Sequence, residues 1–145
     1  MKSTEFKELE KIFKSNYKWG MLYKHCILSA KKPQIKMIYK KLVCQKKSFH
    51  KLLLEQMLKK VDQEYIEKLE IECKKDLREI QQKIHPDLNR KNSLMCCEIE
   101  KRLYSSYCES LREITDGRIR ALILNQKYQL KTFQPELERI EKYLI

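Results

Sequence analysis

The sequence predicts an all-α fold built from two antiparallel helical hairpins. Apolar residues recur at three- and four-residue steps, the spacing of helices that bury one face. Among 145 residues there are only two glycines and three prolines, so long uninterrupted helices are expected. A chain of this length makes one domain, 1–145, and can bury a core without metal or disulfide support. The residues that follow the helical period include Phe6, Leu9, Phe13, Gly20, Tyr23, Ile27, Ile35, Ile38, Leu42, Phe49, Leu52, Ile119, Leu122, Leu130, Phe133, Leu137, Ile140 and Leu144.

The first hairpin is predicted over residues 3–60. Ser3 or Thr4 suits the N-cap of its first helix, because a side-chain oxygen there can accept a hydrogen bond from a free backbone N–H. Pro33 suits the first turn of the second helix, where its missing N–H costs nothing. The short connection between the two helices predicts that they pack antiparallel.

Residues 61–92 are predicted to cross over from the first hairpin to the second. A helical segment over 63–84 has apolar residues on one face, and Pro86 ends it in a loop over 85–92. No glycine or proline marks the start of this segment. One long bent helix that continues past Lys60 is therefore the alternative.

The second hairpin is predicted over residues 93–145. Ser93 is the expected N-cap of its first helix, and Asp116 with Gly117 makes the turn to the last helix. Pro135 lies within that last helix. Because proline cannot donate to the carbonyl four residues back, the helix must either kink or restart there.

The net charge of +12 is concentrated in the first hairpin. Residues 1–60 contain sixteen lysines and four glutamates, whereas residues 61–145 contain sixteen acidic and sixteen basic side chains. A face of this kind would attract nucleic acid or an anionic lipid surface, and the alternative is a lysine face that simply contacts water. Arginine, which favours bidentate phosphate contacts, is absent before Arg78. The two predicted basic stripes are Lys7, Lys11, Lys14 and Lys18, and Lys36, Lys40, Lys47 and Lys51.

Six cysteines lie in helical patterns, and none forms a C-x-x-C pair. Without a secretion signal they are expected to be reduced, small apolar residues. No stretch approaches the ~20 apolar residues of a membrane span. We therefore expect a cytoplasmic protein without a transmembrane segment.

Three segments carry a resemblance to a known family: Arg120–Lys127, the Cys97–Glu98 pair, and Leu9–Ala30. Together with the order of hairpin, crossover and hairpin, they resemble the bacterial ferritin-like four-helix domain family of unknown function. The resemblance covers nearly the whole chain. It implies an antiparallel ferritin-like four-helix bundle with a helical crossover, and it implies little about activity.

Di-iron ferritin-like bundles use a Glu from each of two helices and a Glu-x-x-His motif from the other two. This chain has no Glu-x-x-His, and its only histidines are His25, His50 and His85. We therefore expect no metal site, no cofactor and no catalytic residues. Relative to the pattern of the family, ligand positions are replaced by Lys18, Met21, Lys101, and Gln134 or Pro135.

In place of metal ligands, the sequence predicts a hydrogen-bonded polar layer at the centre of the bundle. Asn16 and Gln45 lie at similar heights above the hairpin turn and are expected to meet. The alternative is that the assumed helix phase is off by one position and these side chains reach water. The four predicted members are Asn16, Gln45, Glu100 and Gln126.

These observations favour a non-catalytic bundle that acts by protein binding or self-assembly, with a homodimer as the expected oligomer. Two alternatives remain open. One is a metal-binding protein with an atypical site that uses Glu98 or Glu100 and cysteines. The other is a module that binds a polyanion or a membrane surface through its basic first hairpin.

Overall fold

A computed structural model of the chain describes residues 3–82 and 89–143. In these two stretches the chain forms five helices and no strand, which confirms the all-α prediction. The helices are α1 (Ser3–Ser29), α2 (Pro33–Met57), α3 (Gln63–Gln81), α4 (Asn89–Glu113) and α5 (Gly117–Tyr143). None of these five helices is long and apolar enough to cross a lipid bilayer.

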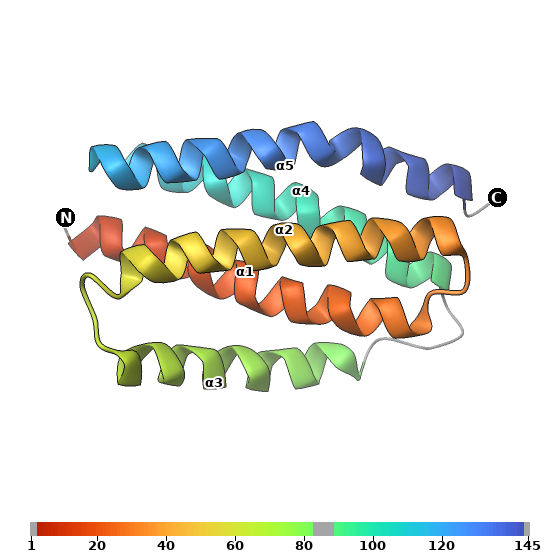
Figure 1. Cartoon of the computed structure of the whole chain (residues 1–145), viewed down its shortest axis with the longest axis horizontal. Helices are drawn as coiled ribbons and strands as arrows, with labels where there is room; N and C mark the ends of the chain where they lie inside the picture. Colours follow the sequence, from red (N-terminus) through yellow and green to blue (C-terminus); the bar gives the residue numbers. More distant parts are fainter. Residues whose placement is uncertain (1–2, 83–88, 144–145) are drawn as a thin grey trace.

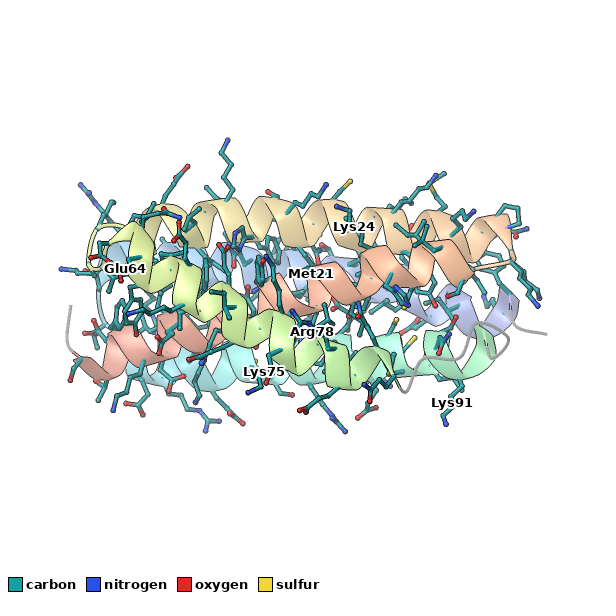
Figure 2. All side chains as sticks on the ribbon, turned by 90° about the horizontal axis from the view of Figure 1, so that it is seen from below. Met21, Lys24, Glu64, Lys75, Arg78 and Lys91 are labelled. Atoms are coloured by element: carbon teal, nitrogen blue, oxygen red, sulfur yellow. The ribbon has the colours of Figure 1, made fainter. Side chains whose placement is uncertain are left out.

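Four of the helices contact one another in a ring. α1 packs on α2 and α4, and α5 packs on α4 and α2. Neighbouring helices around the ring run in opposite directions (Figure 1). α3 lies outside the ring against α1, and it is the foremost helix in Figure 2, where Glu64, Lys75 and Arg78 mark its length.

The helix ends follow local rules at several positions. Pro33 occupies the first turn of α2, as predicted. α2 ends at Met57, so the crossover is a separate helix and not a bent continuation of α2. The Asp62 side chain caps α3 by accepting a hydrogen bond of 2.9 Å from the Tyr65 N–H. Asp116 accepts hydrogen bonds from two N–H groups at the start of α5.

Two features of the second hairpin differ from or refine the sequence predictions. α4 begins at Asn89, four residues before the predicted N-cap Ser93, so the predicted loop is shorter at its end. Pro135 lies inside α5, which continues through it to Tyr143 without restarting. The remainder of the predicted loop, including His85 and Pro86, lies outside the described residues, as does Leu144.

The apolar core forms two clusters. One, around Phe13, Phe49 and Leu103, fills the end of the ring where α1 begins. The other, around Leu22, Tyr39 and further buried residues, fills the end where α1 turns into α2. On α1, α2 and α4 the buried residues between the two clusters are the polar Asn16, Lys46 and Glu100, and the candidate site is built around them.

Candidate functional site

Three of the four residues of the predicted polar layer are buried. Asn16, Glu100 and Gln126 are each at most 5% exposed, whereas Gln45 is half-buried. They do not meet as one set. Asn16 does not bond to Gln45, so that expected contact is wrong, and the two amides belong to different hydrogen-bond networks.

The first network joins α1, α4, α5 and α2 through a tyrosine. The Asn16 amide donates to the Tyr107 hydroxyl at 2.8 Å and to the Ile12 carbonyl at 2.9 Å. Tyr107 in turn donates to the Gln126 side-chain oxygen at 2.6 Å. The Gln126 amide then donates to the Phe49 carbonyl on α2 at 3.3 Å. Because every member is buried, each of these bonds offsets a desolvation cost of ~1–3 kcal/mol.

The second network is an ion pair at the centre of the ring. Lys46 on α2 lies with its Nζ 2.8 Å from Glu100 Oε1 on α4, and both side chains are almost completely buried. Glu100 also accepts a hydrogen bond of 2.6 Å from the Tyr23 hydroxyl through Oε2. Lys46 donates a further bond of 2.7 Å to Gln45 Oε1, so Gln45 reaches the network from its edge.

A glycine makes room for the lysine. Gly20 on α1 faces Lys46, and a Cβ added there would lie 3.0 Å from the Lys46 Cβ. This separation is tighter than normal packing between side chains. The absence of a side chain at position 20 therefore lets α1 approach α2 where the Lys46 stem enters the core.

Burial sets the direction of the pKa shifts in this network. Desolvation lowers the pKa of Lys46, while the facing Glu100 carboxylate acts to raise it. Burial raises the pKa of Tyr23 well above 10, and the negative charge of Glu100 raises it further. The Tyr23 hydroxyl consequently keeps its proton and donates a hydrogen bond to Glu100.

The predicted layer of Asn16, Gln45, Glu100 and Gln126 contained no cation, and the buried Lys46 corrects it. Sequence reasoning missed Lys46, Tyr23 and Tyr107, which supply the strongest contacts. One signal pointed to Lys46: a carboxylate at an interior position needs a positive partner, and Lys46 follows directly after the predicted Gln45. The helix phase assumed for α2 was off by that one residue.

The residues considered as metal ligands do not converge. Within residues 3–82 and 89–143, no three His, Cys, Asp or Glu side chains come together. Glu98 is exposed and pairs with Arg102 at 3.5 Å, and Glu100 is held by Lys46. The His50 ring packs against the rings of Phe13 and Tyr17 at tilted angles, with centroid distances of 4.9 and 5.3 Å. The donor set seen here does not fit a di-metal centre.

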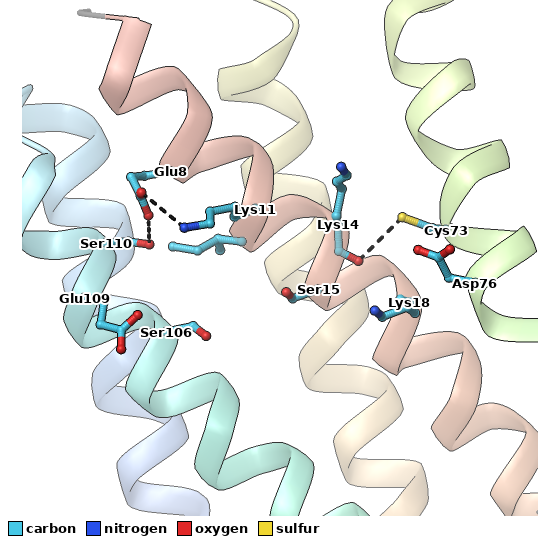
Figure 3. Close-up of a pocket in the computed structure, with 11 residues that line it drawn as sticks. Glu8, Lys11, Lys14, Ser15, Lys18, Cys73, Asp76, Ser106, Glu109 and Ser110 are labelled. Atoms are coloured by element: carbon cyan, nitrogen blue, oxygen red, sulfur yellow. Dashed lines mark hydrogen bonds and ion pairs between the residues drawn. The ribbon is translucent and has the colours of Figure 1, made fainter. Parts of the chain in front are cut away.

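A polar cleft of about 270 Å³ lies between α1, α3 and α4 (Figure 3). Within it, Glu8 accepts a bond from Ser110 at 2.7 Å and pairs with Lys11 at 3.4 Å. Three lysines and three acidic side chains balance each other, so the cleft has no net formal charge. Its lining residues are Glu8, Lys11, Ile12, Lys14, Ser15, Lys18, Cys73, Asp76, Ser106, Glu109 and Ser110.

The two predicted basic stripes have different surroundings. On α1, Lys7 and Lys11 are exposed, but Lys14 pairs with Glu72 of α3 at 3.5 Å. Lys18 lies over the Trp19 ring at 4.5 Å. On α2, Lys40, Lys47 and Lys51 are exposed and Lys36 is half-buried. The α2 stripe is therefore the more open of the two.

Comparisons with protein-family models, curated proteins and solved structures gave no match.

Proposed function

We propose that this protein is a ferritin-like helical bundle without a di-metal centre, and that it acts by binding another protein or a second copy of itself. The observation that carries the proposal is the buried Lys46–Glu100 pair. The Lys46 ammonium and the Glu100 carboxylate occupy the middle of the ring, where related bundles hold metal ions. Because this ion pair holds the helices together, we place the function on the outer faces of the helices.

The outer face of α5 is the best candidate for self-association. Leu124 and Tyr128, one turn apart, are 43% and 67% exposed. Large apolar side chains on one exposed helix face suit isologous packing between two copies. We therefore propose that two copies form a homodimer through this face of α5. We further propose a cytoplasmic location and no catalytic role.

Solution mass and metal content test this function together. Light scattering coupled to size exclusion should give the mass of a dimer, and the Leu124→Glu, Tyr128→Glu double variant should give a monomer. Lys75→Glu, an exposed change on α3 that alters the net charge by the same amount, is the matched control and should stay dimeric. A monomeric wild-type protein would reject self-assembly. Stoichiometric iron, manganese or zinc in protein purified without chelator would reject the metal-free bundle.

A second candidate function is electrostatic binding to a polyanion or an anionic membrane through α2. The open stripe of Lys40, Lys47 and Lys51 supports it. Binding to duplex DNA or to vesicles containing phosphatidylserine should weaken steeply as salt rises. Lys40→Glu with Lys47→Glu should abolish binding, whereas the equal charge change at exposed Lys74 and Lys75 on α3 should not. Equal losses in both variants would indicate net charge alone.

A further inference from the structure

Two buried thiols from different hairpins touch each other. Cys26 on α1 and Cys96 on α4 are both completely buried, and their Sγ atoms lie 4.0 Å apart. All six cysteines are free thiols in the structure. Cys26 and Cys96 are separated by 70 positions in the chain, so the fold brings them together and their sequence spacing does not.

The thiol pair lies near the ends of its helices. Cys26 is three residues before the end of α1, and Cys96 is in the second turn of α4. Next to them, the Tyr39 hydroxyl and Ser93 Oγ lie 2.7 Å apart. A helix end opens and shifts more readily than a helix centre, because fewer hydrogen bonds and contacts hold it.

We propose that Cys26 and Cys96 form a reversible oxidation site, at which hydrogen peroxide converts the two thiols into a disulfide that joins α1 to α4.

The chemistry divides between the two thiols. The contact between the two thiols lowers the pKa of Cys26, whereas the pKa of Cys96 is raised by that contact and by burial. Cys26 therefore loses its proton more readily, and its thiolate attacks the peroxide. Its sulfur takes one oxygen to become a sulfenic acid, and the other oxygen leaves as hydroxide. The Cys96 sulfur then attacks the Cys26 sulfur, forms the S–S bond and displaces a second hydroxide. With the two thiol protons, the products are one disulfide and two waters.

The geometry demands only a local adjustment. A disulfide needs its sulfurs at about 2.0 Å, so the pair must close by about 2 Å through side-chain rotation and a small shift of the helix ends. The new bond would close a loop that contains all of α2 and α3. It would therefore hold the two hairpins together and restrict the unfolded chain.

Peptide mapping tests the site directly. All samples carry Cys44→Ser, which removes the exposed thiol and so prevents disulfides between molecules through that position. Protein treated with hydrogen peroxide is unfolded in N-ethylmaleimide, digested with trypsin and analysed by mass spectrometry. The expected product links peptide 25–31 to peptide 92–101 and disappears with dithiothreitol. The oxidised protein should melt at least about 5 °C above the reduced protein.

The second peptide contains both Cys96 and Cys97, so two variants assign the bond. Cys97→Ala should keep the cross-link and Cys96→Ala should lose it. Absence of the linked peptides in the peroxide-treated Cys44→Ser protein would overturn the proposal, and so would a cross-link that survives in Cys96→Ala. An oxidised protein that melts no higher than the reduced one would overturn the predicted clamping of the hairpins.

Discussion

At the scale of single residues, we expect changes at the Lys46–Glu100 pair to have the largest effect on the free energy of unfolding. A buried charge that loses its partner costs ~3–5 kcal/mol, because desolvation is no longer offset by attraction. We expect Lys46→Met and Glu100→Gln each to lower the free energy of unfolding by about that amount. Urea titrations followed by circular dichroism measure the change.

The double variant of these two residues separates pairing from packing. With both charges removed, no uncompensated ion remains in the core. We expect Lys46→Met with Glu100→Gln to cost less than the sum of the single variants, by at least about 2 kcal/mol. Strict additivity would show that the two side chains do not interact in solution.

The buried tyrosines predict how stability depends on alkaline pH. Burial raises the pKa of Tyr39 and Tyr107 far above the usual 10. The pKa of Tyr23 is raised by burial and by the negative charge of Glu100. Above about pH 10 the unfolded phenols lose their protons while the folded ones keep them. The unfolded state then binds fewer protons, so stability falls by up to ~1.4 kcal/mol per pH unit for each tyrosine.

The ionisation of Lys46 changes stability in the opposite direction as pH rises. Its lowered pKa makes the unfolded state bind more protons than the folded state up to about pH 10.5. One lysine opposes three tyrosines, so the net stability should still fall between about pH 10 and pH 11. Urea titrations across this range give the slope. Tyr39→Phe should make the slope of stability against pH shallower by the contribution of one tyrosine, which is up to ~1.4 kcal/mol per pH unit. An unchanged slope would show that Tyr39 ionises normally in the folded state.

Residue patterns predicted which side chains enter the core much better than how these side chains pair. Asn16, Glu100 and Gln126 were placed in the interior by helical period alone, and they are buried. Lys46 was missed because lysine usually faces water and because a one-residue error in phase rotates a helix by about 100°. The role of Tyr107 could not be predicted, since no local rule indicates a hydrogen-bond partner 91 positions away.

At the scale of the elements, Gly20 controls how closely α1 and α2 pack. Replacing a helical glycine with alanine ordinarily stabilises by ~0.5–1 kcal/mol, because glycine loses more backbone entropy on folding. Here the new Cβ would meet the Lys46 Cβ at 3.0 Å, and the ion pair with Glu100 restrains that side chain. We expect Gly20→Ala to destabilise by about 1 kcal/mol, with crowding outweighing propensity. Thermal unfolding measures the sign.

The other glycine of the chain is the matched control. Gly117 begins α5, and a Cβ added there meets nothing within 4 Å. Gly117→Ala should therefore leave stability unchanged or raise it slightly. If Gly20→Ala stabilised the protein, the Lys46 side chain could move away from the added Cβ without losing its contacts.

Helix existence could be predicted from the sequence, but some boundaries and contacts could not. The apolar face of α3 is clear in the sequence, yet nothing local says that this face covers α1. Ser93 resembles an N-cap, but in the fold its hydroxyl bonds to Tyr39 inside the core. A long-range contact of this kind overrides the local capping preference.

At the scale of the whole molecule, most of the buried side-chain hydrogen bonds link the two hairpins, and the Tyr107–Gln126 bond within the second hairpin is an exception. Asn16 bonds to Tyr107, and Glu100 receives bonds from both Tyr23 and Lys46. Each hairpin thus buries polar groups whose partners belong to the other. Separated hairpins would lose these bonds, each worth ~0.5–1.5 kcal/mol net, together with the apolar contacts between the halves, which couples the folding of the two halves.

This coupling predicts that the chain unfolds as one unit. Urea unfolding followed by circular dichroism and by the fluorescence of the single tryptophan, Trp19, should give coincident transitions. A fragment of residues 1–61 should be partly helical and melt without a cooperative transition, since Asn16, Tyr23 and Lys46 lose their partners. Adding a fragment of residues 62–145 should restore a cooperative transition. A 1–61 fragment that unfolds cooperatively at the midpoint of the full chain would show that the first hairpin is stable by itself, and that the central ion pair joins two independent folding units.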